Sequence, residues 1–357
     1  MAYTTIDDPS KHHQTKVYTG NGSSNHAITF DGNSNMQPDW LWNKVSSEAD
    51  SHASWDSSRG NTKLLYPNIT LAEDTDGNGN IESFDSNGFT VGGNQQYANH
   101  DGATQVTWAW KANGGTTTSF SASGAQLAGT RQTNATAGFS IILYTGDGNN
   151  NATIPHGLNS PPKWVLIKDR GDSSNWYVGH KSTFSTGEVF LNTDAGIAGA
   201  FGPFNKTAPD ANNITLGTDG SVNGNNDTFV AYVFADVKGY SKFSSYEGIG
   251  GTNGPFVYTG FRPAWLMYRN IDRTENWIIV DTKRNPVNRV TGANLQANVT
   301  DAQVNELRWG FDFLSNGFKV RQNESQNANN GDGETIIYMA FAEHPFVTSK
   351  GVPVPAR

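Results

Sequence analysis

Short apolar runs alternate along the chain with stretches rich in Gly, Asn, Ser and Pro, and no segment has the periodicity of a long helix. Three of the clearest runs are WVLIK at 164–168, WLMYR at 265–269 and NWIIVD at 276–281. Runs of this length bounded by turn formers are typical of strands packed on a second sheet. The Asn-Gly pairs at 87–88 and 316–317 predict tight hairpins, because both residues tolerate positive φ. The pattern therefore predicts an all-β fold.

The same pattern occurs three times along the chain. Each copy opens on a tyrosine and paired glycines, and about 20 residues later a proline stands two residues before a tryptophan, at Trp40, Trp164 and Trp265. At offsets of four, twelve and sixteen residues from these tryptophans, the copies carry Lys44, Lys168 and Arg269; His52, Trp176 and Trp277; and Asp56, His180 and Asp281. Ungapped agreement of this kind indicates a copied structural unit.

The later half of each copy sets the module boundaries. SFDSNGFTV at 83–91 matches DFLSNGFKV at 312–320, and each copy closes on an aromatic run that ends at Trp110, Phe234 or Phe341. We therefore expect three tandem antiparallel β-sandwich modules of the jelly-roll, lectin-like type, with little helix. The predicted modules are residues 1–112, 138–242 and 243–357, and the Gly-, Thr-, Ser- and Ala-rich residues 113–137 are predicted to be a flexible linker. Without a comparable linker between them, the second and third modules should pack as a unit.

The repeated tryptophans have two interpretations. Exposed tryptophans could stack on sugars, as in a lectin. Trp40, Trp164 and Trp265 instead recur at one place between apolar neighbours, which favours core positions of a repeated sandwich. We predict that they are buried.

Two copies also share an acid–base pair. Asp56 with Arg59, and Asp281 with Arg284, have the same i,i+3 spacing and are predicted to tie a loop to the sandwich. The middle copy has His180 and Thr183 in these places, so the pair is not a required catalytic unit.

The composition and the missing motifs argue against several classes of function. A net charge of -8 argues against a nucleic-acid partner, and the absence of Cys excludes disulfides and Cys-ligated zinc. No apolar run approaches the length of a membrane span. The motifs of serine hydrolases, zinc proteases and P-loop nucleotide binders are missing, and no strand presents the alternating carboxylates of a sandwich glycosidase. We therefore expect a binding or structural protein rather than an enzyme.

One loop resembles a calcium site. In DTDGNGNIESFD, the oxygen-bearing residues Asp74, Asp76, Asn78 and Asp85 occupy positions 1, 3, 5 and 12 of an EF-hand-type loop, with Gly79 at position 6. Position 12 is Asp rather than Glu, and no helices are expected to flank the loop. A polar hairpin loop explains the same letters. Apart from this candidate Ca²⁺ loop, no cofactor is expected.

Non-repeated loops are the expected contact surfaces, because the scaffold does not dictate their residues. The segment GIAGAFGPFN places Phe201 and Phe204 among glycines, and we predict a partner contact there. The alternative is that both rings fold under the loop.

The motifs YTGxG, PxW, DFLSNGFKV and IYMAFAEHPFV, with the opening MAYTTIDDPSKHHQTKVYTGNGS and the ending GVPVPAR, resemble a family of virion proteins from marine tailed bacteriophages. The resemblance runs over essentially the whole chain. It implies concanavalin-type sandwich modules and a place on the phage particle, and it supplies no catalytic residues.

The leading hypothesis is a tail fibre or tail-associated adhesin that binds a glycan or protein on the host surface. It would be anchored to other virion proteins by the first module and would form a homo-oligomer, with the polar arm from Thr4 to Lys16 docked on another subunit. Alternatives are a capsid decoration or head-fibre protein, and a free carbohydrate-binding or hydrolytic protein.

Overall fold

The computed structural model describes residues 2–75, 81–93, 96–199, 202–288, 292–305, 309–321 and 327–353. Antiparallel strands dominate these residues. Their helices are short: η1 (Pro9–Lys11), α1 (Gly220–Asn223) and α2 (Asn327–Asn330). None of the described helices has the length and apolarity needed to cross a membrane. The predicted all-β fold is confirmed.

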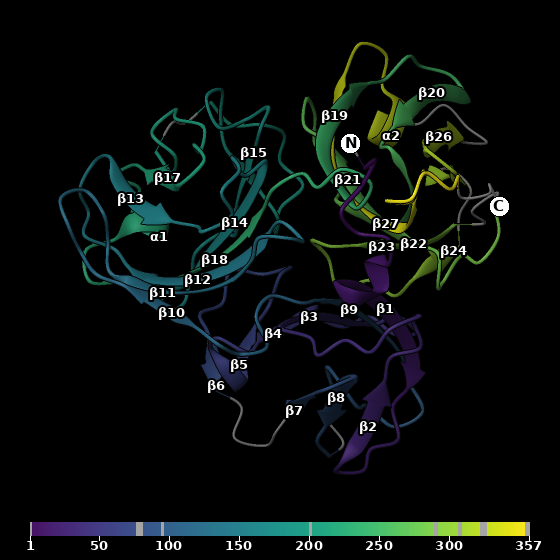
Figure 1. Cartoon of the computed structure of the whole chain (residues 1–357), viewed down its shortest axis with the longest axis horizontal. Coiled ribbons are helices and arrows are strands. Elements are labelled where there is room, and N and C mark those ends of the chain that lie inside the picture. The colour runs from purple at the N-terminus through teal and green to yellow at the C-terminus, as the bar shows by residue number, and fades with distance from the viewer. Residues whose placement is uncertain are drawn as a thin grey trace.

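The strands form three lobes arranged around a common centre (Figure 1). Lobe 1 (residues 13–110) has a large sheet in the order β1-β9-β3-β4-β5-β6 and a small sheet in the order β2-β8-β7. Its strands are β1 (His13–Thr19), β2 (His26–Thr29), β3 (Trp40–Val45), β4 (Ala53–Asp56), β5 (Gly60–Leu65), β6 (Asp74–Thr75), β7 (Ile81–Asp85), β8 (Gly88–Val91) and β9 (Thr104–Trp110).

Lobe 2 (residues 118–234) has a large sheet in the order β10-β11-β12-β18-β14-β15-β16 and a small sheet of β13 and β17. Its strands are β10 (Thr118–Phe120), β11 (Gly129–Asn134), β12 (Phe139–Thr145), β13 (Ala152–Pro155), β14 (Trp164–Asp169), β15 (Tyr177–His180), β16 (Val189–Phe190), β17 (Asn213–Leu216) and β18 (Thr228–Phe234).

Lobe 3 (residues 241–345) has a large sheet in the order β19-β27-β21-β22-β23-β24 and a small sheet in the order β20-β26-β25. Its strands are β19 (Ser241–Glu247), β20 (Asn253–Tyr258), β21 (Phe261–Asn270), β22 (Ile278–Asp281), β23 (Ala293–Gln296), β24 (Val304–Asn305), β25 (Phe311–Leu314), β26 (Gly317–Arg321) and β27 (Thr335–Pro345).

The three large sheets share one strand order. In each, the last strand of the lobe (β9, β18 or β27) lies between the first repeated strand (β1, β12 or β19) and the strand that carries the repeated tryptophan (β3, β14 or β21). In every lobe that tryptophan pairs with the closing aromatic residue, as Trp40 with Trp110, Trp164 with Phe234 and Trp265 with Phe341. The register thus matches the sequence repeat. Domain boundaries at 112, 137 and 242 remain a prediction.

Each lobe has its own core between its large and small sheets. In lobe 1, Ile28 of β2 and Phe89 of β8 pack with Leu41 of β3 and Trp55 of β4. Lobes 2 and 3 have equivalent clusters, which include Ile154 of β13 in the former and Val257 of β20 in the latter. Each lobe is therefore a two-layer sandwich.

Residues 113–137 do not form the flexible linker that their composition predicted. β11 pairs with β12 over six residue pairs, and β10 pairs with β11, which extends the large sheet of lobe 2 at one edge. Small polar residues suit such a half-exposed edge, and the ready-made partner β12 decides the conformation.

Both predicted Asn-Gly hairpins are present, but the glycines act differently from the prediction. Asp85 pairs with Gly88 and Leu314 pairs with Gly317, so the turn residues are Ser-Asn, one position earlier. A Cβ on Gly88 would collide with the carbonyl oxygen of Ile28 on β2, and Gly317 meets the same obstacle on β20. The glycines are needed because neighbouring backbones approach closely.

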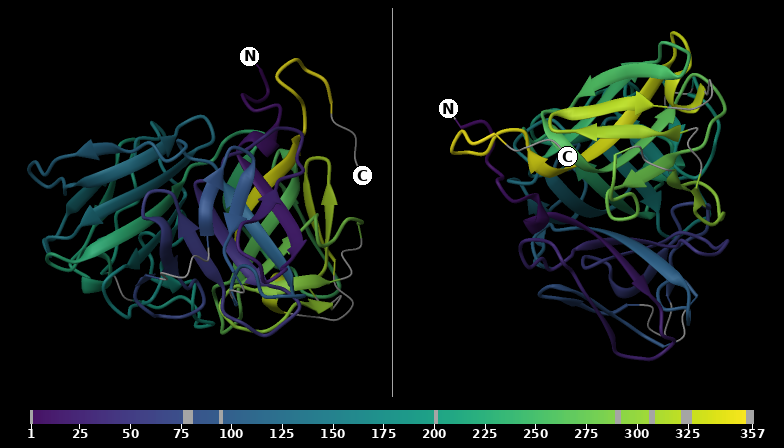
Figure 2. Two further views of the ribbon diagram at one scale, coloured as in Figure 1. Left: turned by 90° about the horizontal axis from the view of Figure 1, so that it is seen from below. Right: turned by 90° about the vertical axis from the view of Figure 1, so that its right-hand side faces the viewer.

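The N-terminal arm (residues 2–12) packs on lobes 2 and 3 of its own chain. Thr4 donates a hydrogen bond to the carbonyl of Lys238 at 2.8 Å, and Ile6 enters a hydrophobic core. Asp7 accepts a hydrogen bond from the backbone of Ser349 at 2.6 Å, and both views of Figure 2 show the N-terminus beside the segment after β27. These contacts within one chain hold the arm in place, and docking of the arm on another subunit stays a prediction.

Candidate functional site: the shared core and the surfaces around it

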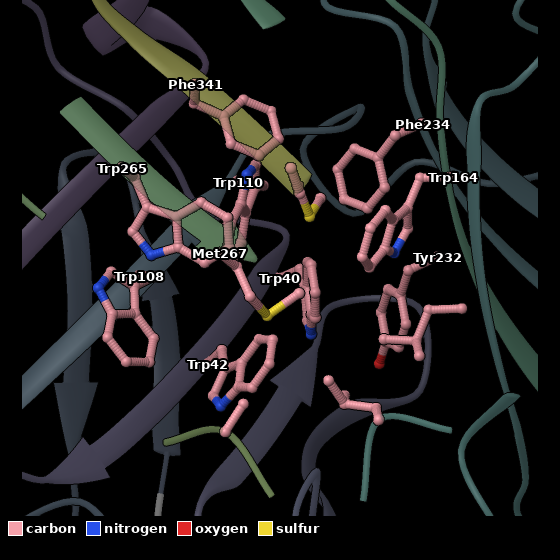
Figure 3. Packing of buried hydrophobic residues seen from close by; sticks show 14 of the residues in the cluster. Trp40, Trp42, Trp108, Trp110, Trp164, Tyr232, Phe234, Trp265, Met267 and Phe341 are labelled. Carbon is pink, nitrogen blue, oxygen red and sulfur yellow. The ribbon is translucent and has the colours of Figure 1, made fainter. Parts of the chain in front are cut away.

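A fourth core lies where the three large sheets meet, and it contains eight of the ten tryptophans. Figure 3 shows residues of all three lobes converging there. The eight, all buried, are Trp40, Trp42, Trp108, Trp110, Trp164, Trp176, Trp265 and Trp277. The predicted burial of the repeated tryptophans is confirmed. Their place differs from the prediction, because they fill the space between lobes rather than the interior of one sandwich.

Strand alternation explains this placement. On β3, Trp40 and Trp42 face the shared core while Leu41 faces the core of lobe 1. On β14, Trp164 and Val165 divide in the same way. Successive side chains point to opposite faces of a strand, so a sheet that is covered on both faces needs a continuous apolar run. This is why these strands lack a polar face.

The three closing aromatic residues meet at the centre. The ring centroids of Trp110 and Phe341 are 5.7 Å apart, those of Phe234 and Phe341 5.8 Å, and those of Trp110 and Phe234 6.4 Å. One ring comes from each lobe, so the three lobes surround a pseudo-threefold axis.

The repeated tryptophans contact the next lobe in a cyclic order. Trp40 of lobe 1 stacks on Tyr232 of lobe 2 with a centroid distance of 4.3 Å. Trp164 of lobe 2 meets Trp277 of lobe 3 at 5.6 Å, and Trp265 of lobe 3 meets Trp110 of lobe 1 at 5.6 Å. Each lobe therefore contacts both others, and the ring is closed.

Hydrogen bonds from the residues twelve positions after each repeated tryptophan also link the lobes in a cycle, which runs in the opposite direction. The indole of Trp176 donates to the carbonyl of Tyr66 in lobe 1 at 2.8 Å. The indole of Trp277 donates to the carbonyl of Phe190 in lobe 2 at 2.8 Å. In lobe 1 the position is His52, whose Nε2 lies 3.0 Å from the carbonyl of Gln296 in lobe 3.

His52 makes its hydrogen bonds to Trp42 and Gln296 only in its neutral form with the proton on Nε2. The indole of Trp42 donates to its Nδ1 at 2.9 Å, which leaves Nε2 as the donor to lobe 3. Burial lowers the pKa of His52 to about 3, so the ring is neutral at pH 7.

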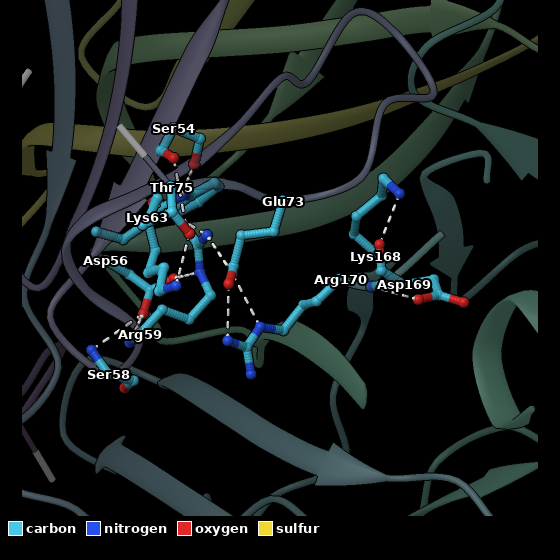
Figure 4. A network of polar contacts seen from close by, with 12 residues as sticks. Ser54, Asp56, Ser58, Arg59, Lys63, Glu73, Thr75, Lys168, Asp169 and Arg170 are labelled. Atoms are coloured by element: carbon cyan, nitrogen blue, oxygen red, sulfur yellow. Dashed lines mark hydrogen bonds and ion pairs between the residues drawn. The ribbon is translucent and has the colours of Figure 1, made fainter. Parts of the chain in front are cut away.

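A buried ionic network ties lobe 1 to lobe 2 (Figure 4). Arg59 pairs with Asp56 at 2.5 Å and with Glu73 at 3.0 Å, and Arg170 of lobe 2 reaches both oxygens of Glu73 at 2.9 Å. Tyr232 of lobe 2 donates to Asp56 at 2.6 Å. Burial alone would raise the pKa of Glu73, but its bonds to Arg170 and Arg59 hold it below the ordinary value. The prediction that Asp56 and Arg59 tie down a loop is confirmed. Both residues also contact Tyr232 and so bridge lobes 1 and 2.

The interface between lobes 1 and 3 repeats this arrangement. Asp281 pairs with Arg284 at 2.6 Å and accepts a hydrogen bond at 3.0 Å from the indole of Trp108, which is the lobe 1 equivalent of Tyr232. At the third interface the equivalent donor position holds Met339, and the acceptor position holds His180. A methionine cannot donate a hydrogen bond, so the interface between lobes 2 and 3 lacks both the donor and the carboxylate.

The three repeated cations are also buried and satisfy backbone carbonyls at strand ends. Lys44 donates to the carbonyl of Glu48 at 2.9 Å, and Lys168 donates to that of Asp172 at 2.9 Å. Arg269 reaches from lobe 3 into lobe 2, where it donates to the carbonyl of Phe190 at 2.9 Å. Burial lowers the pKa of each lysine to about 8.

The described part of the candidate calcium loop is divided between two sheets. Asp74 lies in β6 of the large sheet, where it accepts a hydrogen bond from Tyr66 at 3.4 Å. Asp85 ends β7 of the small sheet and accepts hydrogen bonds from Ser83 at 2.6 Å and Thr90 at 2.8 Å. Asp76 and Asn78 lie outside the described residues, so calcium binding here stays a prediction.

The predicted contact at Phe204 is wrong for that residue. Its side chain is buried in the core of lobe 2 and packs edge-on against Phe184 with centroids 5.2 Å apart. The alternative interpretation, a ring folded under the loop, holds here. Phe201 lies outside the described residues.

Two other polar sites were not foreseen. Within the described ranges, Asp169, Asp172 and Asp227 bring carboxylate oxygens within 4.8 Å of one another. Asp169 already accepts backbone hydrogen bonds from Gly171 at 2.8 Å and from Asp172 at 3.1 Å, so the turn accounts for its position.

A cleft of about 200 Å³ also lies between lobes 1 and 3, lined among others by His13, Asp31, Lys283 and His344.

Sequence reasoning missed a third repeated set that supports the cycle. Asn68, Asn192 and Asn298 accept backbone hydrogen bonds from His52, Trp176 and Trp277, respectively, at 2.8 to 2.9 Å. The first two asparagines stand 28 residues after their repeated tryptophans, whereas the third stands 33 residues after, because its loop is longer. A comparison of the copies that allowed a gap would have found them.

Comparison with known families gives one match. A family model described as a domain of unknown function (DUF7483) matches residues 8–345. No curated protein matches the chain. The matched region runs from the N-terminal arm to the end of β27 and so takes in all three lobes.

Proposed function

The chain belongs to this DUF7483 family, and on that premise we propose that it is a structural protein of a bacteriophage particle, a tail-associated adhesin that binds the host surface. One observation carries the proposal. Three sandwiches are closed into a ring by a shared aromatic core, while their small sheets face outward. A body of this kind holds several recognition surfaces in fixed relative positions, which limits the entropy lost on binding.

The resemblance of the opening and closing segments to marine phage virion proteins supports the location on a particle. The role is one of binding rather than catalysis, and the outward strands and loops carry recognition while the repeated residues build the scaffold. Other virion proteins are the proposed attachment partners, and lobe 1 with the arm is the proposed anchor. Copies of the chain are proposed to form a homo-oligomer, in which each copy occupies one attachment site on the particle.

The pseudo-threefold arrangement favours one second candidate, a capsid decoration or head-fibre protein. A chain that presents three similar lobes around one axis matches the local threefold positions of a capsid shell. The two roles differ in copy number, since a tail carries on the order of ten copies and a shell carries tens to hundreds.

Quantitative mass spectrometry and cryo-electron microscopy of purified phage particles test the proposal. We expect the chain at the tail in low copy number, with cross-links from lobe 1 or the arm to another tail protein. High copy number on the shell would replace the adhesin by the decoration protein. Absence of the chain from particles would refute both. A truncation lacking residues 1–137 is not a clean test, because it removes lobe 1 from the shared core.

A further inference from the structure

The outer face of the small sheet of lobe 3 carries two exposed aromatic side chains. Phe256 is 46% exposed and Tyr258 is 55% exposed, and they are the only aromatic residues among the large apolar side chains that the described chain exposes. All ten tryptophans are buried. Both rings belong to β20, and because they are two residues apart they point to the same side of the sheet.

The register places a defined set of residues beside these rings. On β26, Phe256 pairs with Lys319 and Tyr258 pairs with Gly317, and on β25 Lys319 pairs with Asp312. Side chains of paired residues in an antiparallel sheet lie on one face. The face that we call the aromatic face therefore consists of Phe256, Tyr258, Gly317, Lys319, Arg321, Asp312 and Leu314.

The rings form a continuous and fixed surface. A Cβ on Gly317 would lie 3.1 Å from the ring of Phe256, which shows that this ring extends over the glycine towards Tyr258. The hydroxyl of Tyr3 donates to the carbonyl of Gly260 at 2.8 Å and lies 3.0 Å from the hydroxyl of Tyr258, so it accepts a hydrogen bond from that residue. The N-terminal arm thus holds Tyr258 in place.

The fold does not require aromatic residues at these positions. In lobe 1 the equivalent residues of β2 are Ala27 and Thr29, which pair with Thr90 and Gly88. In lobe 2 the equivalent residues of β13 are Thr153 and Pro155. The same sandwich therefore forms with small side chains, and exposed rings in lobe 3 indicate a binding surface.

The size of the face favours a narrow ligand. Each ring exposes about 100 Å², whereas a stable protein interface buries about 800 Å² on each partner. A polysaccharide fits better, because the C–H face of a sugar ring packs on an aromatic ring and its hydroxyls hydrogen-bond to flanking polar groups. Rings two residues apart along a strand are about 7 Å apart, so one extended sugar chain can contact both.

The charge of the face favours an acidic sugar. It carries two cations, Lys319 and Arg321, and one carboxylate, Asp312, in a protein whose net charge is -8. Arg321 pairs with Asp312 at 2.9 Å, and Lys319, the cross-strand partner of Phe256, donates to the carbonyl of Gly254. A polysaccharide with a carboxylate at intervals matches this sparse positive charge, whereas nucleic acid requires clustered cations.

From these observations we propose that the aromatic face binds an acidic polysaccharide, with sugars stacked on Phe256 and Tyr258 and a carboxylate at Lys319. This inference rests on the proposed adhesin function and names the class of host-surface ligand.

Isothermal titration of the full-length protein with short oligogalacturonates and with their methyl esters tests the inference. The double variant Phe256→Ala, Tyr258→Thr introduces the residues of lobe 1, which the fold accommodates, and Lys319→Thr does the same for the cation. Leu71→Thr, which changes an exposed apolar residue in another part of the surface, is the matched control.

We expect the wild type and Leu71→Thr to bind oligogalacturonate and to bind the neutral ester more weakly. The double variant should lose about tenfold or more in affinity for both, and Lys319→Thr should lose the preference for the acid. Equal binding by wild type and double variant, or no binding by the wild type, overturns the inference. Self-association of the wild type that the double variant lacks would assign the face to a second copy instead. Because these measurements use free protein, they can fail while particle imaging still finds the chain on the tail.

Discussion

The core that the three lobes share and the cores inside the lobes are built from different residues. The shared core holds eight tryptophans, whereas the core of lobe 2 holds none and those of lobes 1 and 3 hold one each, Trp55 and Trp309. Two facing sheets lie about 10 Å apart, a gap that aliphatic side chains and phenylalanines fill. Three converging sheets leave a wider space, which larger rings fill.

This difference shows what the sequence repeat encodes. The residues that recur most strictly, Trp40 and its equivalents, contact a neighbouring lobe rather than the opposite sheet of their own lobe. A lobe on its own would therefore expose the tryptophans of its large sheet to solvent. We infer that the lobes are parts of one folding unit.

The largest expected effect comes from separating a lobe. Residues 238–357, expressed alone, contain all strands of lobe 3 but lack every partner of Trp265 and Trp277 outside that lobe. We expect this fragment to aggregate or to unfold without cooperativity, as followed by near-UV circular dichroism during urea titration. A sharp transition with native-like aromatic signals would show that lobe 3 is an independent domain.

Two tryptophan substitutions compare the cores directly. Trp110→Ala removes the central ring that contacts Phe234 and Phe341, and Trp55→Ala creates a similar cavity inside lobe 1. Each should lower the free energy of unfolding by about 4 kcal/mol. Hydrogen exchange distinguishes them: Trp110→Ala should reduce protection in all three lobes, whereas the local effect of Trp55→Ala should stay in lobe 1. The same exchange pattern in both variants would argue against a separate shared core.

Acid should weaken the shared core through its histidines. Burial lowers the folded-state pKa of His13 and of His52 to about 3. Because the unfolded chain binds these protons from about pH 6.5 downwards, the stabilisation is present above pH 6.5 and decreases as the pH falls towards 3. At pH 5 the loss should be about 2 kcal/mol for each histidine.

Urea denaturation between pH 7 and pH 4 measures this loss. His52→Gln should reduce the slope of unfolding free energy against pH by the contribution of one proton. An unchanged slope in that variant would show that His52 does not titrate on unfolding.

The smallest expected effect concerns the hydroxyl that links lobes 1 and 2. Tyr232→Phe removes the donor to Asp56 and should cost about 2 kcal/mol. In a double-mutant cycle, Asp56→Asn should cost less when Phe already stands at 232. Met339→Leu, at the equivalent position that has no donor, is the control and should cost less than Tyr232→Phe. Additive losses at 56 and 232 would mean that the bond does not couple the lobes.

The sequence predicted the elements better than their assembly. Apolar runs located the strands, and the repeat identified the buried tryptophans, because periodicity reports which residues need cover. Periodicity does not show whether a residue is buried by its own lobe or by a neighbouring lobe. The unbroken apolar run Trp40-Leu41-Trp42 at the start of β3 was the available signal, since a one-sided sandwich strand would alternate with polar residues.

The errors have similar causes. Residues 113–137 have a linker composition, but pairing with β12 makes strands of them. Phe204 stands among glycines, yet Phe184 covers it from across the loop. The aromatic face was not foreseen because Phe256 and Tyr258 stand out only when β20 is compared, in register, with β2 and β13.

Differential scanning calorimetry of the full-length protein tests most directly whether the shared core makes the three lobes one unit. We predict a single transition whose calorimetric enthalpy equals its van't Hoff enthalpy, with the whole chain unfolding together. Two or three resolved transitions, or a calorimetric enthalpy well above the van't Hoff value, would contradict the account and show that the lobes fold as separate domains.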